Sequence, residues 1–180
     1  IAKFNATSFS AVPEVYGMLM KYGRLDEQKM PRLRYMSVAG GGLRHDLSVQ
    51  MAELIAPADF YVMYGQSEAS ARLAVLPPDQ LTVREGSIGK ALSGVELAVL
   101  DENNRTLRQG EAGMLCARGP NVMLGYWQDE AATVEALSDG WLRTGDLARA
   151  DADGYFYIEG RANLLVKVQG YRVHPVEIES

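Results

Sequence analysis

The chain has 180 residues, of which 47% are hydrophobic, and it carries a formal net charge of −5 and one cysteine. This length fits one domain, or one domain with part of another, and the apolar residues are enough to bury a core. Lysine and arginine are scattered without a basic stripe, which argues against a nucleic-acid-binding surface. No apolar run approaches the roughly 20 residues of a membrane span.

The single cysteine, Cys116, lies in an apolar run with the pattern of a strand. It has no partner for an internal disulfide, so we expect a reducing, cytoplasmic setting. A small buried hydrophobic side chain is favoured over a nucleophile. The sequence begins at Ile1 rather than at a methionine, so we expect a piece of a longer protein, with any targeting signal outside it.

The first third of the chain alternates predicted helices and buried strands. Helical spacing of apolar residues predicts a helix over about 13–22, and a strand at 33–39 precedes a second helix over about 46–55. Between this strand and the second helix, Gly40, Gly41 and Gly42 would let the backbone approach a ligand closely. They match no Walker loop and no GxGxxG pattern, so a tight strand–helix turn is the alternative.

A second strand at 59–64 delivers Gly65-Gln66-Ser67-Glu68 at its carboxyl end. Ligands bind at the carboxyl ends of such strands in α/β sheets. The alternative is an ordinary capped turn, with Ser67 as the N-cap and Glu68 in the first turn of a helix.

From residue 76 onward the composition changes to short alternating strands separated by turn signals. Strands are predicted at 95–100, 111–118 and 154–158, with a short helix at 129–137, which is typical of a small antiparallel sheet or barrel. The Asp-Ala-Asp-Gly run at 151–154 is interpreted as a hairpin turn. It fails as a calcium loop, because the first and last ligand positions hold arginine and glycine.

Thr144-Gly145-Asp146 is predicted to be a glycine-containing acidic turn. An ionised carboxylate there could accept hydrogen bonds from two neighbouring hydroxyls, such as those of a ribose. The alternative is a turn aspartate bonded to its own backbone. Two short β-rich runs at 164–168 and 171–173 follow, and a helix start is expected near Pro175.

Several motifs occur in one order and together resemble those of the adenylate-forming superfamily, which comprises acyl-CoA synthetases, luciferase-like ligases and peptide-synthetase adenylation domains. A single motif would be weak, but the ordered set is specific and covers nearly the whole chain. The motifs are Tyr64-Gly-Gln-Ser-Glu68 for the family's YGxTE, Gly86-Ser-Ile-Gly89 with Gly94, Gly113 to Gly119 with Gly125-Tyr126-Trp127, Thr144-Gly-Asp146, Gly160-Arg161 followed by Val166-Lys167 and Gly170-Tyr-Arg-Val173, and Glu177-Ile-Glu179.

The resemblance implies an α/β (α+β) fold in three parts. Residues 1–85 would be a strand–helix layer of the large AMP-binding domain, and residues 86–160 a distorted antiparallel β-barrel subdomain. Residues 161–180 would form the hinge and the first strands of a small mobile domain. The family's phosphate loop would precede Ile1 and its catalytic lysine would follow Ser180, so we expect this piece to be inactive by itself.

The resemblance also assigns site residues in the first half of the chain. Gly40, Gly41 and Gly42 would border the adenine and acyl pockets. Tyr64, followed by Gly65, would stack on adenine. Ser67 would contact the α-phosphate, and Glu68 would hold Mg²⁺, roles that suit a hydroxyl and a hard carboxylate.

In the second half, Asp146 would bind the ribose, and Arg161 would reach the ribose or a phosphate as a charged donor. Lys167 matches a lysine near the adenylate, and Gly170 matches a glycine lining the tunnel of the acceptor thiol. A surface lysine and a hairpin glycine remain the alternatives. Asn163 stands at the hinge in place of Asp or Lys. It tolerates unusual backbone angles as aspartate does, but it lacks the charge.

The implied function is an ATP-dependent ligase that activates a small carboxylic acid as an acyl-adenylate, releases pyrophosphate and then forms an acyl-thioester. ATP or AMP, Mg²⁺ and coenzyme A are the implied cofactors, and fatty-acid metabolism is the expected setting. The ending from Gly170 to Glu179 is closer to acyl- or aryl-CoA synthetases than to peptide-synthetase domains, so an acyl carrier protein is the alternative acceptor. An inactive nucleotide-binding module and a structural β-domain are the rival hypotheses, and the identity of the acid stays open.

Overall fold

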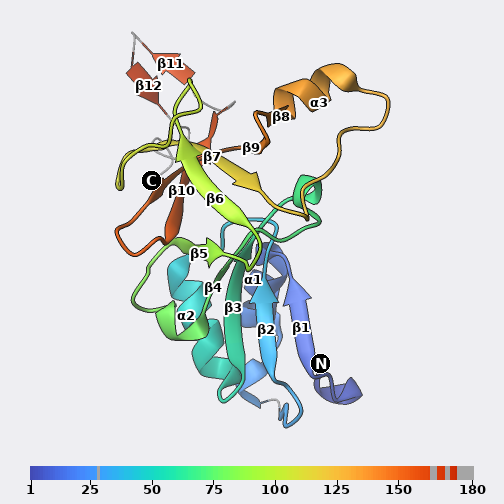
Figure 1. Cartoon of the computed structure of the whole chain (residues 1–180). Coiled ribbons are helices and arrows are strands. Elements are labelled where there is room, and N and C mark those ends of the chain that lie inside the picture. The colour runs from blue at the N-terminus through green and yellow to red at the C-terminus, as the bar shows by residue number, and fades with distance from the viewer. Residues whose placement is uncertain (28, 163–165, 169–170, 174–180) are drawn as a thin grey trace. The chain divides into compact units, whose positions relative to one another are not determined.

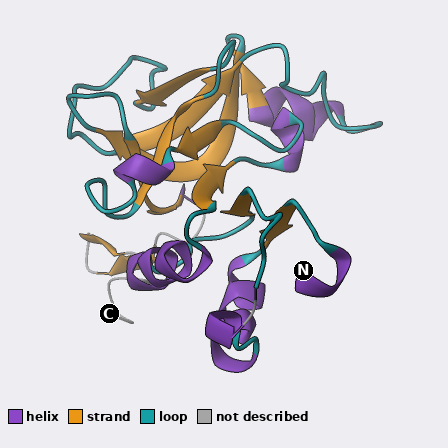
Figure 2. Cartoon of the chain, turned by 90° about the horizontal axis from the view of Figure 1, so that it is seen from below, coloured by secondary structure: helices purple, strands orange, loops and turns teal. Residues whose placement is uncertain are grey.

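The computed structural model describes residues 1–27, 29–162, 166–168 and 171–173, with side chains described only through residue 162. The chain separates into two compact units, one of residues 1–65 with 74–90 and the other of residues 66–73 with 91–180. Each unit is described by itself. Helices and strands are mixed along the chain (Figure 2), which confirms the predicted α/β class.

The first unit contains a mixed sheet with strands in sequence order (Figure 1). Strands β1 (Ser8–Ala11), β2 (Tyr35–Val38) and β3 (Asp59–Tyr64) are parallel. Strand β4 (Ala74–Leu76) is antiparallel to β3, and β5 (Ser87–Ala91) lies next to β4. The parallel strands bring their carboxyl ends to one edge, which is the edge where α/β sheets bind ligands.

Two helices connect the parallel strands, and both were predicted. Helix α1 (Pro13–Tyr22) begins with proline in its first turn, where the missing N–H costs no hydrogen bond. Helix α2 (His45–Ile55) packs on β3. Short 3₁₀ turns occur at Ala2–Phe4, Leu25–Glu27 and Pro78–Gln80.

The core of the first unit is built around Tyr16, which is fully buried. Its ring meets Phe60 edge-to-face at 5.3 Å, and its hydroxyl donates to the Ser37 carbonyl at 2.7 Å. The hydroxyl therefore has the partner that a buried polar group requires. Burial raises the pKa of Tyr16 to about 12, so it remains a donor at neutral pH.

The second unit contains an antiparallel sheet of four main strands, β6 (Glu96–Leu100), β7 (Gly113–Arg118), β9 (Trp141–Ala150) and β10 (Phe156–Arg161). Their order in the sheet is β10-β9-β7-β6. Strand β8 (Leu137–Ser138) pairs with β9, and β11 (Val166–Val168) pairs with β12 (Tyr171–Val173). The predicted sheet is thus confirmed, while closure into a barrel and the domain bounds at 85 and 160 stay predictions.

The prediction of a turn at Thr144-Gly145-Asp146 is wrong, because these residues lie inside β9. The register with β7 shifts here, so that the three residues stand opposite Leu115 alone, as a bulge. The Thr144 hydroxyl donates to the Leu115 carbonyl at 2.8 Å and accepts the Asp146 N–H at 3.1 Å. A side-chain hydroxyl thus replaces ladder hydrogen bonds, and Gly145 takes the positive φ of 78° that the bulge needs.

The predicted hairpin at 151–154 is confirmed. The Asp151 carboxylate accepts hydrogen bonds from the backbone N–H groups of Asp153 and Tyr155 and from the Tyr157 hydroxyl. The two bonds from backbone N–H groups are those of a turn aspartate, and the third comes from Tyr157 at the start of β10. The predicted short helix is α3 (Glu130–Ala136), which is capped by the preceding aspartate.

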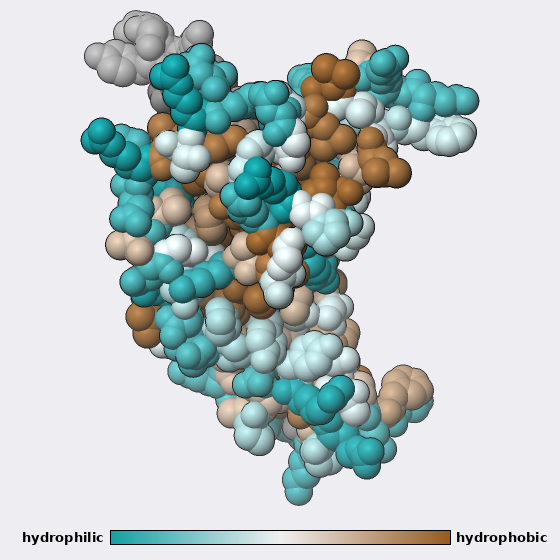
Figure 3. Space-filling view, in the orientation of Figure 1, coloured by the Kyte–Doolittle hydropathy of each residue, from teal (hydrophilic) through white to brown (hydrophobic). Residues whose placement is uncertain are grey.

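On the face shown in Figure 3, hydrophobic residues lie among hydrophilic ones. Within the part of the chain that the structure describes, no helix is both long enough and apolar enough to span a bilayer.

Candidate functional site

Two predicted site segments meet at the carboxyl edge of the parallel strands in the first unit. Val38 of β2 is opposite Val62 of β3. The strands therefore deliver Gly40–Gly42 and Tyr64-Gly65 to the same edge. Neighbouring parallel strands bring the loops that follow them to one edge of a sheet, which is where α/β sheets bind ligands.

The three glycines at this edge differ in their surroundings. A Cβ added to Gly40 would lie 3.4 Å from Cγ1 of Val12, and one added to Gly41 would lie 3.3 Å from Cγ of Pro13. A Cβ on Gly42 would have no atom within 4 Å. Close packing on the start of α1 gives Gly41 a structural reason, while Gly42 leaves open space.

Ser67 and Glu68 belong to the second unit, in the 3₁₀ turn η3 (Ser67–Ala69). The capped-turn interpretation is wrong in detail, because Gln66 occupies the N-cap position and makes no side-chain capping bond. Ser67 is exposed, so its hydroxyl is accessible. Glu68 is half-buried, and its Oε1 accepts a hydrogen bond of 2.8 Å from the Tyr126 hydroxyl.

The same turn is held by the loop that follows β7. The Asn121 amide donates to the carbonyls of Ala69 and Arg72, at 2.9 and 2.8 Å. The Met123 N–H donates to the Glu68 carbonyl at 2.7 Å. Sequence reasoning missed these contacts, because they join segments about fifty residues apart and follow no local period.

Asp146 and Arg161 are brought together across β9 and β10, where they are register partners. Arg161 Nε lies 2.9 Å from Asp146 Oδ1. The Asp146 side chain is 8% exposed and that of Arg161 is 57% exposed. A buried carboxylate is thus paired with a cation whose other N–H groups can face a ligand, because a guanidinium has five donors.

The predicted site side chains are of the types that bind nucleotides. A carboxylate can accept from vicinal hydroxyls, a guanidinium can donate to ribose or phosphate oxygens, and a tyrosine face can stack on a base. The described residues hold no group of three or more His, Cys, Asp or Glu side chains suited to a metal. A lone carboxylate such as Glu68 still fits Mg²⁺, which keeps several waters and is bound through one or two carboxylates and substrate phosphates.

Three predicted site residues lie at the C-terminal end. Lys167 is in β11, opposite Arg172 of β12, and only its backbone is described. Asn163 and Gly170 lie outside the described residues. Their assigned roles stay predictions.

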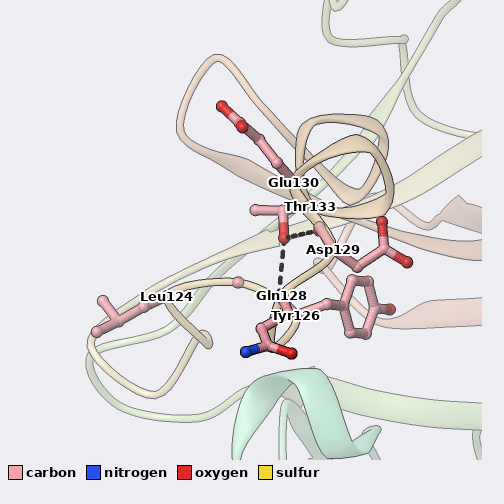
Figure 4. A pocket seen from close by; sticks show the side chains of 7 residues that line it. Leu124, Tyr126, Gln128, Asp129, Glu130 and Thr133 are labelled. Carbon is pink, nitrogen blue, oxygen red and sulfur yellow. Dashed lines mark hydrogen bonds between the residues drawn. The ribbon is translucent and has the colours of Figure 1, made fainter.

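An open pocket of about 450 Å³ lies beside α3 in the second unit (Figure 4). Thr133 links its two sides, because its hydroxyl donates to the Asp129 carbonyl and accepts the Tyr126 N–H. The pocket contains none of the residues predicted for the site. Its lining residues are Leu124, Gly125, Tyr126, Gln128, Asp129, Glu130 and Thr133.

Cys116 is fully buried in β7, as predicted for a small core residue. Burial raises its pKa to about 11, against a smaller lowering by the charge of Arg143. Because the thiolate is the reactive form, we expect no alkylation of Cys116 by iodoacetamide at pH 8 in the folded protein and full alkylation in urea. Mass spectrometry of the Cys116 peptide measures this, and equal labelling in both states would contradict it.

A family model for AMP-binding enzymes matches residues 1–127. The chain therefore belongs to the AMP-binding enzyme family, as the order of its motifs predicted. A long-chain-fatty-acid–CoA ligase of Salmonella typhimurium is 35% identical over 184 residues, which cover 99% of this chain and 32% of the ligase. The chain thus spans about a third of the length of the curated relatives it matches.

Two solved structures are similar to this chain. The amide bond synthetase McbA from Marinactinospora thermotolerans has a TM-score of 0.89 and 29% identity, over 99% of this chain and 36% of that one. The o-succinylbenzoate CoA synthetase MenE from Bacillus subtilis, in complex with its acyl-adenylate intermediate, has a TM-score of 0.87 and 27% identity, over 98% and 35%.

Proposed function

We propose that this chain carries the adenine- and ribose-binding part of an ATP-dependent acid–thiol ligase. The protein that contains it would activate a carboxylic acid as an acyl-adenylate and transfer the acyl group to coenzyme A. The observation that carries the proposal is the Asp146–Arg161 pair, which presents a buried carboxylate and exposed donors on adjacent strands. The chain belongs to the AMP-binding enzyme family, which supports a nucleotide as the ligand of this pair.

In the first half-reaction, a carboxylate oxygen of the acid attacks the α-phosphorus of ATP, and the bond to pyrophosphate breaks. The chain contributes positioning and charge neutralisation rather than covalent chemistry. Tyr64 would hold the adenine, Asp146 the ribose hydroxyls, and Arg161 and Ser67 the oxygens of the ribose and α-phosphate. Mg²⁺, when bound at Glu68, would neutralise phosphate charge.

In the second half-reaction, a thiol displaces AMP. Coenzyme A is the proposed acceptor, because the relatives include CoA ligases for long-chain fatty acids and for 2-succinylbenzoate. We place the protein in the cytoplasm, where a free cysteine such as Cys116 stays reduced. An amine is the second candidate acceptor, because an amide bond synthetase is among the similar structures.

Exchange of radiolabelled pyrophosphate into ATP tests the proposal in the full-length protein. We expect exchange only in the presence of a carboxylic acid, from a panel of aliphatic and aromatic acids, and a CoA thioester once coenzyme A is added. Amide formation with an amine, and no thioester, would favour the second candidate. Loading of a phosphopantetheinyl carrier protein would favour that acceptor, and AMP binding without any exchange would indicate an inactive module.

A further inference from the structure

Tyr126 and Glu68 are 58 residues apart in sequence, and a hydrogen bond joins them in the second unit. The Tyr126 hydroxyl donates to Oε1 of Glu68 at 2.8 Å, although the tyrosine is 40% exposed. A contact near solvent is usually weak unless both of its partners are held in place by other bonds. Here both partners are held.

On one side, three hydrogen bonds hold the backbone of the glutamate turn and of the residues just after it. The Asn121 amide donates to the carbonyls of Ala69 and Arg72, and the Met123 N–H donates to the carbonyl of Glu68 itself. The same loop, residues 121–126, therefore provides both the bonds that position the turn and the tyrosine that contacts its carboxylate.

On the other side, α3 fixes the tyrosine. Thr133 accepts the Tyr126 N–H at 2.8 Å and donates to the Asp129 carbonyl at 2.7 Å, as the dashed lines in Figure 4 mark. Asp129 in turn caps the helix by accepting the Ala132 N–H. A Cβ on Gly125 would lie 2.8 Å from Cγ2 of Thr133, so the loop passes the helix as closely as glycine allows.

We propose that Tyr126 is a positioning residue for Glu68. The Tyr126 hydroxyl holds Oε1 of Glu68, which would leave Oε2 available to Mg²⁺ when the metal is bound. This rests on the proposed function, in which Glu68 holds the metal. Among the described residues, Tyr126 is the one hydrogen-bond partner that the Glu68 carboxylate has. A carboxylate oriented in advance loses less rotamer freedom on binding, and partners outside the ligand set typically change metal affinity about 10- to 100-fold.

The donor role of Tyr126 is secure at neutral pH. The hydrogen bond to Glu68, with burial and the charges of Glu68 and Asp129, raises the pKa of Tyr126 above its ordinary value. The phenol therefore stays protonated at neutral pH and can donate this hydrogen bond.

The test is the Mg²⁺ dependence of pyrophosphate exchange at fixed ATP in the full-length protein. We expect Tyr126→Phe to raise the half-saturating Mg²⁺ concentration about tenfold, with the free energy of unfolding nearly unchanged. Trp127→Phe, at the adjacent and 89% exposed position, is the matched control and should behave as the parent. Glu68→Gln should raise the requirement at least as much, and the double variant Tyr126→Phe/Glu68→Gln should match Glu68→Gln alone.

The other outcomes separate the two proposals. If Glu68→Gln raises the Mg²⁺ requirement and Tyr126→Phe leaves it unchanged or lowers it, the positioning role is overturned while the proposed function stands. If Glu68→Gln has no effect on it, the metal role of Glu68 fails, and the inference fails with it. A loss of stability in Tyr126→Phe with a normal Mg²⁺ requirement would make the contact purely structural.

Discussion

Replacing Asp146 by asparagine or alanine is expected to raise the KM for ATP of the full-length protein by about 10- to 100-fold. The carboxylate would accept from two ribose hydroxyls, and a hydrogen bond to a charged group contributes about 1.5–3 kcal/mol. Each 1.4 kcal/mol corresponds to about a factor of ten in affinity. Asparagine has nearly the same shape as aspartate, so its effect reports the lost acceptor and charge rather than a cavity.

The matched control for Asp146 is Glu159→Gln. Glu159 forms an ion pair with Arg149 between the same two strands, at 2.7 Å, with both side chains at least 40% exposed. This pair lies outside the proposed site, so its loss should leave ATP kinetics unchanged. Initial rates against ATP and a calorimetric titration with AMP measure the effect. An Asp146→Asn enzyme with parental ATP kinetics, or an equal effect of both variants, would remove Asp146 from the site.

Gly89→Ala is expected to cost about 3 kcal/mol or more in the free energy of unfolding, or to prevent folding. Gly89 lies in β5 and is buried, and a Cβ there would overlap the backbone of Val75 in β4. Its φ of +90° adds the left-handed strain that an L side chain incurs. Backbone atoms cannot rotate aside as a side chain can, so β4 and β5 would have to separate.

Gly86→Ala separates the backbone overlap from the strain of a positive φ. Gly86 has a φ of +74°, but a Cβ there would meet no atom within 4 Å. We expect this variant to lose only the conformational part, about 1 kcal/mol. Urea unfolding of both variants gives the difference, and similar losses would show that strand contact at Gly89 contributes little.

The sequence alone determined the secondary structure where local physics dominates. The helix at 13–22 follows from its apolar period and proline start, and the strand at 59–64 from its length and apolar content, and both match the structure. The sequence also determined the family, because the order of the motifs along the chain identifies it without reference to tertiary contacts. The wrong turn at Thr144-Gly145-Asp146 shows the limit, since glycine and aspartate occur in turns and in bulges alike.

The tertiary structure decided how those residues act. Asp146 faces Arg161 because the β9–β10 register makes them partners, and the Thr144 hydroxyl keeps the bulge inside a strand because Leu115 of β7 supplies an acceptor. Glu68 is held by Tyr126 from a distant loop. Each of these is a contact between residues well separated in sequence, and no local pattern encodes it, because its partners come together only when the chain folds.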